Sequence, residues 1–533
     1  MKVDKLHIRS QFKNLENVKV DFDEDHLMTV VVGRNGSGKS NVLEALVAIF
    51  RNLDLGVSPP FSYELTYRLG ESLRSNPDSE RWVEITIDAD PSRGTTSKQY
   101  QVKVRDLSLI DHTESMFGEA SPGKVVPFSK VKRDKEGNAP YLPNYVFAYY
   151  SGPSDRLESH FKKHRTDFYR RLLKDELDLK GDIRPLFYAK PHHSQFVLLA
   201  FFLSEEDSAE KSFLREHLGI EGLDSIHFVM RRPGWTKKVG ELFWGARGVV
   251  RRFLDELIKY TLSPVKVTRQ EDTSLTGSNL RNEFLHLFLP DVESLREFAR
   301  DLSPDELFKM LESTLLSEII SEVSVRVITS SSEEPLTFRE LSEGEQQLLT
   351  VLGLLKFTGG KDSLFLLDEP DTHLNPSWAV KYLRFLREFV PNHEASHLLM
   401  ISHHPLAIAE LKREQVQVMR RDEDQKITAS MPDENPRGMG INLILRSDMF
   451  GLQTTLDDDT NEMLSDRNSL AAQERLSKEK IVRKEGRDPE TEEEYLSWLN
   501  SELEVLGFNL AADDPDYFEF LREKYHSKKL EKH

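Results

Sequence analysis

The sequence predicts an α/β fold whose two halves are separated by a long, mainly helical insertion and followed by a helical C-terminal extension. Three observations carry this prediction. An apolar strand at residues 26–32 runs through a glycine-rich turn into a helical pattern at residues 41–50. A second apolar run, residues 364–367, ends in two acidic residues. About 300 residues lie between the glycine-rich turn and that second region, and much of this segment has helical apolar spacing.

The composition excludes several classes of protein. The 533 residues include no cysteine, which rules out disulfide scaffolds, thiolate metal sites and cysteine nucleophiles. Residues 1–15 lack the apolar segment of a secretory signal, and no apolar run is long enough to span a membrane, so we expect a cytoplasmic protein. The formal net charge of −18 argues against a surface generally coated by nucleic acid, although it allows local basic patches.

Residues 33–40, GRNGSGKS, match the phosphate-loop (P-loop) pattern G-x-x-x-x-G-K-[ST]. The strand before the motif and the helix after it direct backbone N–H groups and a helix N-terminus toward phosphate oxygens. We expect Lys39 to reach the β- and γ-phosphates of ATP, and Ser40 to bind Mg²⁺. The alternative, a chance glycine turn, does not account for the strand and helix on either side. The predicted ATP-binding residues of the loop are Gly33, Arg34, Asn35, Gly36, Ser37, Gly38, Lys39 and Ser40.

The second apolar run belongs to SLFLLDEPDTHLNP, residues 363–376. A carboxylate at the carboxyl end of a buried strand can hold the hydration shell of Mg²⁺, and we assign this role to Asp368. The neighbouring Glu369 is then placed to polarise the attacking water as a general base. The alternative is that the two acids only cap a strand.

Two further motifs follow the same pattern of strand or helix ends. LSEGEQQLL, residues 341–349, begins a helix, and Ser342 with Glu345 has the spacing of a capping box, which is an ordinary structural reason for both residues. HLLMISHHP, residues 397–405, predicts a buried strand that ends in His403 and His404. A metal-binding pair is the alternative for these histidines, but adjacent side chains on an extended strand point to opposite sides.

Together these motifs resemble those of ABC-type ATPases. In that family the signature motif, here LSEGEQQ, closes over the γ-phosphate held by a second subunit, so that two ATP molecules are sandwiched in a head-to-tail dimer. The resemblance implies that Ser342 and Gly344 act in trans. It also implies that Asp371 lies in the loop linking the two sites and that His403 contacts the γ-phosphate. Glu343 departs from the glycine that transporter subunits usually carry.

The order and spacing of the motifs are most similar to the OLD, RecF and SMC ATPases. Asn35 and Asn41 match asparagines that this group prefers beside the P-loop glycine and serine, so Asn41 joins the predicted ATP-binding residues. The long gap before the signature argues against a transporter subunit. The predicted domains are residues 1–155, the N-terminal lobe of the ATPase head; 156–325, a mainly helical insertion; 326–430, the C-terminal lobe with the signature; and 431–533, a charged helical region for docking a partner.

A basic stretch inside the insertion is a candidate nucleic-acid contact. Residues 230–252 hold seven basic side chains and one acidic side chain, interleaved with Trp235, Phe243 and Trp244, which could stack on bases. The alternative is a solvated helix face with core aromatic residues. The basic residues are Arg231, Arg232, Lys237, Lys238, Arg247, Arg251 and Arg252.

The sequence contains no nuclease motif that we can identify. A chain of this length with OLD-like motifs and a C-terminal INLILRSDMFGLQTTLD segment resembles the PtuA ATPases of bacterial anti-phage systems. That family works with a separate HNH-type nuclease, PtuB. The resemblance therefore implies an ATPase that forms a homodimer around ATP and Mg²⁺ and regulates a nuclease bound to its C-terminal region. The alternative is a RecF-like DNA repair ATPase that acts on DNA directly.

Overall fold

The protein is represented by a computed structural model, which describes residues 1–71, 81–107, 123–134, 137–174, 184–236, 241–272, 279–358, 362–422, 424–473, 476–481 and 488–508. The chain divides into two compact units. The first comprises Met1–Ile444 and Asp448–Phe450, and the second comprises Leu445–Ser447 and Gly451–His533. None of the described helices is long and apolar enough to cross a membrane.

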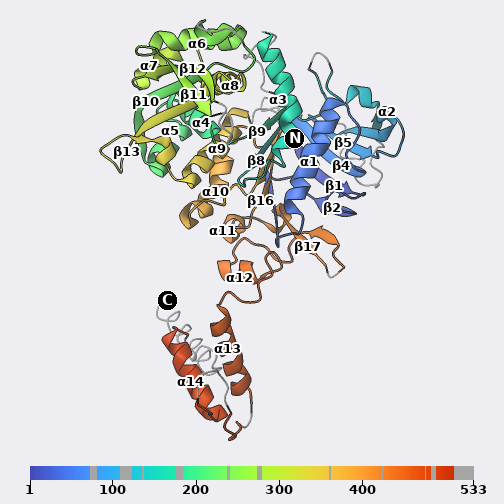
Figure 1. The fold of residues 1–533 in the computed structure, drawn as a ribbon. Helices are drawn as coiled ribbons and strands as arrows, with labels where there is room; N and C mark the ends of the chain where they lie inside the picture. The colour runs from blue at the N-terminus through green and yellow to red at the C-terminus, as the bar shows by residue number, and fades with distance from the viewer. Residues whose placement is uncertain are drawn as a thin grey trace, which may run out of the picture. The chain divides into compact units, whose positions relative to one another are not determined.

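A seven-stranded sheet at the centre of the first unit brings together distant parts of the sequence (Figure 1). Its strand order is β18-β17-β3-β16-β15-β8-β9, and every neighbouring pair is parallel except β17 and β18. The buried residues on both faces of β3, β15 and β16 explain their uninterrupted apolar sequences. The strands are β3 (Met28–Gly33), β8 (Tyr145–Tyr150), β9 (Leu186–Tyr188), β15 (Ser363–Asp368), β16 (Ser396–Ile401), β17 (Val416–Arg421) and β18 (Ile427–Ser430).

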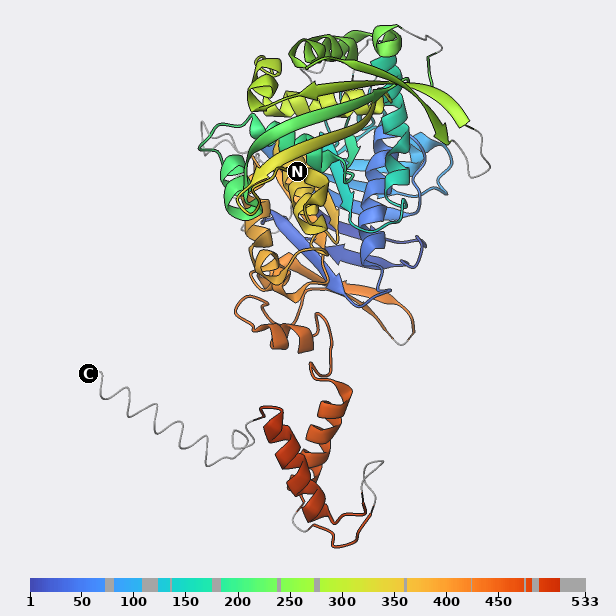
Figure 2. The same ribbon diagram turned by 60° about the vertical axis from the view of Figure 1, so that its left-hand side comes forward.

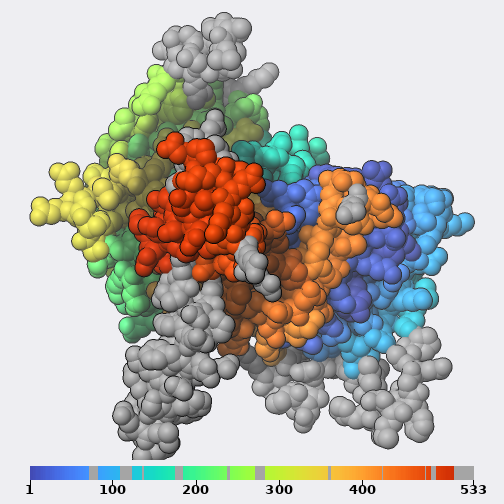
Figure 3. Space-filling model, turned by 90° about the horizontal axis from the view of Figure 1, so that it is seen from below, coloured from blue at the N-terminus to red at the C-terminus, as the bar shows by residue number. Residues whose placement is uncertain are grey.

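An antiparallel sheet of order β2-β1-β4-β5-β6-β7 lies on one side of the central sheet, with helix α1 (Lys39–Leu55) in the apolar core between them. Residues 82–88 and 99–105 alternate apolar and polar side chains, which predicts an antiparallel pair, and this prediction is confirmed because they lie in β5 and β6. Figure 3 shows β17 and β18 (orange) beside these N-terminal strands (blue). The elements are β1 (Lys2–Ile8), β2 (Val18–Asp21), β4 (Tyr63–Glu71), β5 (Arg81–Ala89), α2 (Thr96–Gln99), β6 (Tyr100–Asp106) and β7 (Lys124–Val126).

The inserted segment contains helices and also a third sheet, of order β11-β12-β10-β13-β14. The spacing of apolar residues in 281–302 predicts one helix, and this prediction is wrong for its first part: residues 281–289 belong to strand β12, and a helix begins only at Val292. Residues 284–289 are almost all apolar, a pattern that fits either a helix or a strand. They form a strand because they pair with β10 on one side and with β11 on the other. The strands are β10 (Ile220–Arg231), β11 (Val265–Asp272), β12 (Asn279–Leu289), β13 (Ile320–Thr329) and β14 (Leu336–Thr337).

Helices fill the space between the third sheet and the central sheet and form one large apolar core with both. The predicted α/β head with a large insertion and a helical C-terminal extension is confirmed. The helices of this unit are α3 (Glu158–Leu173), α4 (His193–Phe202), α5 (Ala209–Leu218), α6 (Gly248–Leu257), α7 (Val292–Phe298), α8 (Pro304–Leu316), α9 (Glu343–Thr358), α10 (Pro376–Phe389) and α11 (Pro405–Ile408). Helix α12 (Ile441–Arg446) spans the point where the two units divide.

Helix α3 lies alongside α1 and leads from the central sheet into the insertion (Figure 2). Two histidine–carboxylate hydrogen bonds join the two helices: the half-buried His160 has Nε2 3.1 Å from Glu44 Oε1, and the buried His164 has Nε2 2.8 Å from Asp54 Oδ2. Burial alone would raise the pKa of Asp54, but the hydrogen bond from His164 and the charge of Arg133 hold it below its ordinary value. These pairs fix α3 to the helix that follows the P-loop.

The second unit contains two described helices, α13 (Asp458–Ala471) and α14 (Glu492–Val505). They pack through a small apolar cluster of Leu470, Tyr495 and Leu499. Tyr495 also donates a hydrogen bond of 2.9 Å to Asp466 Oδ2. Because residues 437–444 belong to the first unit, the division of the chain lies later than the predicted boundary at residue 431.

Candidate nucleotide-binding site

The P-loop connects the end of β3 to the start of α1, as the motif predicts. Gly33 has φ +140°, and a Cβ atom there would lie 2.2 Å from the carbonyl oxygen of Met419 on β17, so only glycine fits. Gly38 is the residue before α1 and has φ +88°, in the left-handed region that glycine adopts without strain. The loop therefore turns sharply and leaves the N-terminus of α1 directed at the loop.

Lys39 is buried at the base of the loop. Its ammonium group donates to the carbonyl oxygens of Gly33, at 2.8 Å, and Arg34, at 3.0 Å. Burial lowers the pKa of Lys39 to about 8, although the charges of Glu369 and Asp368 oppose this shift. The cation is held by neutral carbonyls, which phosphate oxygens would replace with stronger charge-assisted hydrogen bonds.

An asparagine that the sequence motifs did not identify supports the loop. Asn14, between β1 and β2, donates to the carbonyl oxygen of Gly36 at 3.1 Å. Its own Oδ1 accepts from Asn41 Nδ2 at 2.6 Å. Asn41 thus has a partner within the protein, while Arg34 and Asn35 are exposed on the loop. The contacts of these three residues with ATP remain predictions.

The two predicted Mg²⁺ ligands meet at the carboxyl ends of β3 and β15. Ser40 Oγ donates to Asp368 Oδ1 at 3.0 Å, and Asp368 is only 2% exposed. Burial raises the pKa of Asp368 to about 6, against the lowering effects of the Arg156 charge and the Ser40 hydrogen bond. A hydroxyl and a carboxylate are the hard oxygen ligands that Mg²⁺ prefers.

The hydrogen-bonding capacity of the loop also suits a phosphate group. Ser37 Oγ is buried, and among the described residues it has no hydrogen-bond partner. A buried hydroxyl without a partner is costly in a folded protein, and a phosphate oxygen would accept its hydrogen bond. The residues present therefore fit a nucleotide phosphate with its magnesium ion.

Glu369 and His403 face each other across the ends of β15 and β16, with His403 Nε2 3.0 Å from Glu369 Oε1. Glu369 has φ +53°, an uncommon backbone conformation for this residue, and its N–H donates to the carbonyl oxygen of Ile401. Burial and the nearby Lys39 charge lower the pKa of His403, although Glu369 opposes this. The lowered pKa favours the neutral form of the His403 imidazole.

The two adjacent histidines have separate partners, which argues against a metal-binding pair. His404 accepts the N–H of Leu406 at 3.3 Å and so caps the N-terminus of α11, while His403 contacts Glu369. The structure thus distinguishes His403 as the histidine of the candidate site.

A different cluster, His192, His193 and Glu312, has three possible metal ligands close together. Glu312 already accepts from Arg184 at 2.8 Å, and its other oxygen lies 2.7 Å from His193 Nε2. His193 Nδ1 accepts the N–H of Lys190 at 2.8 Å. The ligand atoms of Glu312 and His193 are therefore occupied, and the Arg184 guanidinium repels cations, so these two residues form a structural network.

The loop after β15 turns inward through Asp371. This carboxylate is 2% exposed, and Ser402 Oγ donates to it at 2.5 Å. Burial raises the pKa of Asp371 to about 6, although the Ser402 hydrogen bond lowers it. The Asp371 side chain joins the ends of β15 and β16 within one subunit. The predicted link between the two ATP sites of a dimer would therefore be made by the loop around Asp371.

Because the pKa of Asp371 is higher in the folded protein than its ordinary value of 3.8, ionisation destabilises the fold as the pH rises from about 4 to about 6. We expect Asp371→Asn to stabilise the protein at pH 7 by an amount on the order of 3 kcal/mol relative to its effect at pH 4. Thermal unfolding at several pH values measures this difference. The matched control is Asp301→Asn at an exposed position, and an equal effect at both pH values would contradict the prediction.

The signature motif forms the start of α9. The N–H of Ser342 donates to Glu345 Oε2 at 2.7 Å, and the N–H of Glu345 donates to Ser342 Oγ at 3.3 Å, which confirms the predicted capping box. Gly344 packs so closely on the loop after β15 that a Cβ atom would lie 2.4 Å from the carbonyl oxygen of His373. The side chain of Ser342 is exposed at the helix N-terminus.

The structure corrects part of the prediction for the basic stretch at residues 230–252. Phe243 and Trp244 are 1% and 4% exposed, so they belong to the core and cannot stack on bases. Arg251 pairs with Asp255 at 2.8 Å. Arg231 and Arg232 are half-buried, and Arg247 and Arg252 are exposed. Lys237 and Lys238 lie outside the described residues.

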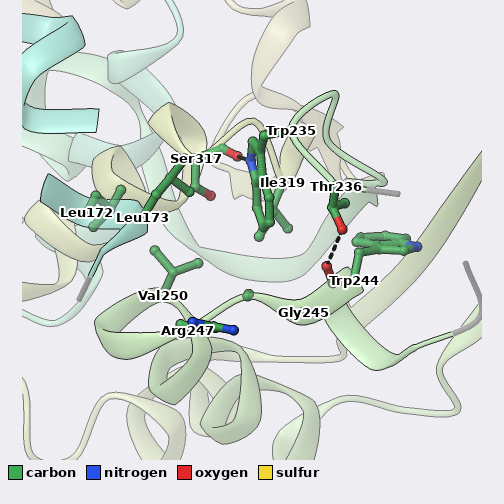
Figure 4. Close-up of a pocket in the computed structure, with 11 residues that line it drawn as sticks. Leu172, Leu173, Trp235, Thr236, Trp244, Gly245, Arg247, Val250, Ser317 and Ile319 are labelled. Atoms are coloured by element: carbon green, nitrogen blue, oxygen red, sulfur yellow. Dashed lines mark hydrogen bonds between the residues drawn. The ribbon is translucent and has the colours of Figure 1, made fainter. Parts of the chain in front are cut away.

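A cavity of about 350 Å³ lies beside this stretch (Figure 4). Leu172 and Leu173 at the end of α3 form one wall, and Trp235 forms another, with its indole N–H bonded to the carbonyl oxygen of Ser317 at 2.7 Å. Arg247 is the charged residue of the lining. The cavity thus touches the C-terminal end of α3, the helix that packs against the P-loop helix α1.

Two family models and one curated relative match parts of this chain. A family model described as "AAA domain, putative AbiEii toxin, Type IV TA system" matches residues 144–409, and one described as "AAA ATPase domain" matches residues 1–170. The chain is 25% identical over 199 residues to the Septu protein PtuA of Bacillus mycoides (strain KBAB4). This match covers 34% of the chain and 27% of that protein.

Two solved structures are similar at low sequence identity. The SMC head domain from Thermotoga maritima has 12% identity and a TM-score of 0.30, over 81% of this chain and 99% of that chain. The Stu0660 protein of Streptococcus thermophilus has 11% identity and a TM-score of 0.25, over 78% of this chain and 75% of that chain. From its motifs, the geometry they form and the two family models, the chain is an ATPase of the OLD/SMC-like group.

Proposed function

We propose that the protein binds and hydrolyses ATP as a head-to-tail dimer, and that its nucleotide state regulates a separate nuclease in bacterial anti-phage defence. One observation carries the ATPase part of this proposal. Lys39, Ser40 and Asp368 converge at the carboxyl ends of β3 and β15, the two strands on either side of β16, and the Glu369–His403 pair lies beside them.

Each side chain of the site has a chemical task in this proposal. Lys39 exchanges its two carbonyl partners for phosphate oxygens. Ser40 and Asp368 are the residues that would hold Mg²⁺, which when bound supplies positive charge to the phosphate oxygens. Glu369 accepts a proton from the attacking water, and the neutral His403 ring donates to Glu369 and holds its orientation.

The exposed start of α9 supports the dimeric arrangement. Ser342 lies at a helix N-terminus, where N–H groups and the helix dipole favour a negative group such as a γ-phosphate. Contacts from Gly344 to His373 and from Gln347 to the carbonyl oxygen of Glu369 connect this helix to the catalytic loop of its own subunit. A phosphate that a second subunit presents to α9 would therefore affect the ATP sites of both subunits.

The proposed control of a nuclease rests on the resemblance to the PtuA family and on the absence of an identifiable nuclease motif in the sequence. The matched segment spans only 27% of the PtuA relative. Helix α12 offers a docking surface, because Ile441 and Leu443 are 44% and 59% exposed. Large apolar side chains that are exposed on one short helix are candidates for contact with a partner.

Affinity purification from the native host tests this part of the proposal. We expect a small HNH-type nuclease to copurify with the full-length protein and to be lost from the double variant Ile441→Asp, Leu443→Asp. A deletion after Phe450 removes the second unit while keeping Ile444 and Met449, which are buried in the first. Val380→Asp, at another exposed apolar side chain, is the matched control.

The alternative function is a DNA repair ATPase that acts on DNA directly. The exposed Arg247 and Arg252 favour it, whereas the burial of Phe243 and Trp244 removes two of the three predicted stacking residues. Copurified DNA that is released by salt, with no nuclease present, would contradict the proposed function and support this alternative.

A further inference from the structure

Arg156 contacts the candidate magnesium site from a direction that the sequence motifs do not account for. It lies in the loop between β8 and α3, and its Nη2 donates to Asp368 Oδ2 at 2.9 Å. The guanidinium also lies over the ring of Tyr150, 4.9 Å from the ring centre. Ser40 therefore donates to one carboxylate oxygen of Asp368, and Arg156 donates to the other.

The placement of Arg156 makes it a competitor for a metal ion. Asp368 is almost fully buried, whereas the Arg156 side chain is 31% exposed. An arginine that can move toward solvent is able to leave the carboxylate, and the carboxylate itself is fixed at the end of β15. A guanidinium and Mg²⁺ beside the same carboxylate repel each other, so each weakens the binding of the other.

We propose that Arg156 is a positioning residue that neutralises Asp368 in the nucleotide-free protein and is displaced from it when ATP binds with Mg²⁺. This inference rests on the proposed ATP site. The backbone of Arg156 is tied to the start of α3, because Ser159 Oγ donates to the Arg156 carbonyl oxygen at 2.7 Å. Displacement of Arg156 therefore reports the presence of Mg²⁺ and ATP to α3.

The test is a titration of the full-length protein with MgCl₂ at a fixed concentration of the fluorescent analogue mant-ATP. We expect Arg156→Ala to lower the half-saturating MgCl₂ concentration about three- to tenfold, because one competing cation is removed from a partly exposed position. Arg156→Lys keeps the charge and should stay close to the wild type. Arg165→Ala, which removes the ion pair with Glu158 on α3, should leave the value unchanged.

A purely structural Arg156 would lower the unfolding temperature without moving the MgCl₂ midpoint, and that result would overturn the inference. A higher midpoint or lost mant-ATP binding in Arg156→Ala would also overturn it, since Arg156 would then contact the nucleotide. If the wild type does not bind mant-ATP at all, the proposed ATPase function fails instead.

A second measurement covers the case in which Arg156→Ala folds poorly. If Arg156 acts through Asp368, its replacement should lower the unfolding temperature of the nucleotide-free wild type but have little effect in an Asp368→Asn background. Equal effects in the two backgrounds would overturn the inference.

Discussion

Replacing Glu369 with glutamine is expected to lower the kcat for ATP hydrolysis by about 10²–10⁴-fold while ATP binding is retained. Glutamine has nearly the same shape as glutamate but cannot accept a proton from water. Because Lys39, Ser40 and Asp368 are unchanged, ATP should remain bound and hold two subunits together. Single-turnover hydrolysis measures the first effect, and light scattering after gel filtration with ATP measures the dimer.

A second substitution in the Glu369→Gln variant tests how the dimer forms. Adding Ser342→Arg places a bulky cation at the exposed start of α9 and should return Glu369→Gln to a monomer that still binds ATP. Hydrolysis at the wild-type rate in Glu369→Gln would show that another group is the general base. A dimer that persists with Ser342→Arg would show that the signature helix does not form the interface.

Lys39→Ala is expected to weaken ATP binding by about 30-fold to 5,000-fold. Removal of one partner from a buried, hydrogen-bonded charge pair typically costs about 2–5 kcal/mol. Lys39 is 5% exposed and is the P-loop cation whose pKa responds to both Asp368 and Glu369, so its charge lies where the phosphates are expected. Isothermal titration calorimetry with ATP and MgCl₂ measures the change in Kd.

Two comparisons separate a loss of binding from a loss of folding. Arg34→Ala removes an exposed side chain of the same loop and should change the Kd much less. Lys39→Met fills the space of the lysine stem, and because the lysine charge is unfavourable in its buried position, the nucleotide-free protein should be at least as stable as the wild type. ATP affinity at the wild-type level in Lys39→Ala would refute the assignment of the site.

The catalytic elements could be predicted from the sequence because each is a local pattern with a fixed structural context. The P-loop, the strand ending in Asp368 and the capping box of Ser342 are all complete within about ten residues, and neighbours in sequence set their geometry. The choice of His403 over His404 comes from the resemblance to ABC-type ATPases, and the alternation of side chains along a strand argues only against a metal-binding pair.

Contacts that arrive through tertiary packing could not be predicted in this way. Asn14 reaches Gly36 only because the loop between β1 and β2 folds over the P-loop, and Arg156 reaches Asp368 only because β8 pairs with β15. Neither residue belongs to a motif with fixed spacing. Strand β12 was predicted as helix because a short apolar run has no clear period, and its neighbours in the sheet come from distant parts of the chain.

Helix α3 connects the loop that holds Arg156 to the cavity lined by Leu172 and Leu173. Its 16 residues span about 24 Å, from the loop that holds Arg156 to Leu172 and Leu173 in the wall of the cavity. Two histidine–carboxylate contacts hold it against the P-loop helix α1. Thermodynamic linkage makes such a connection reciprocal. If a molecule that fills the cavity shifts α3 and changes the affinity for ATP by some factor, then ATP changes the affinity for that molecule by the same factor.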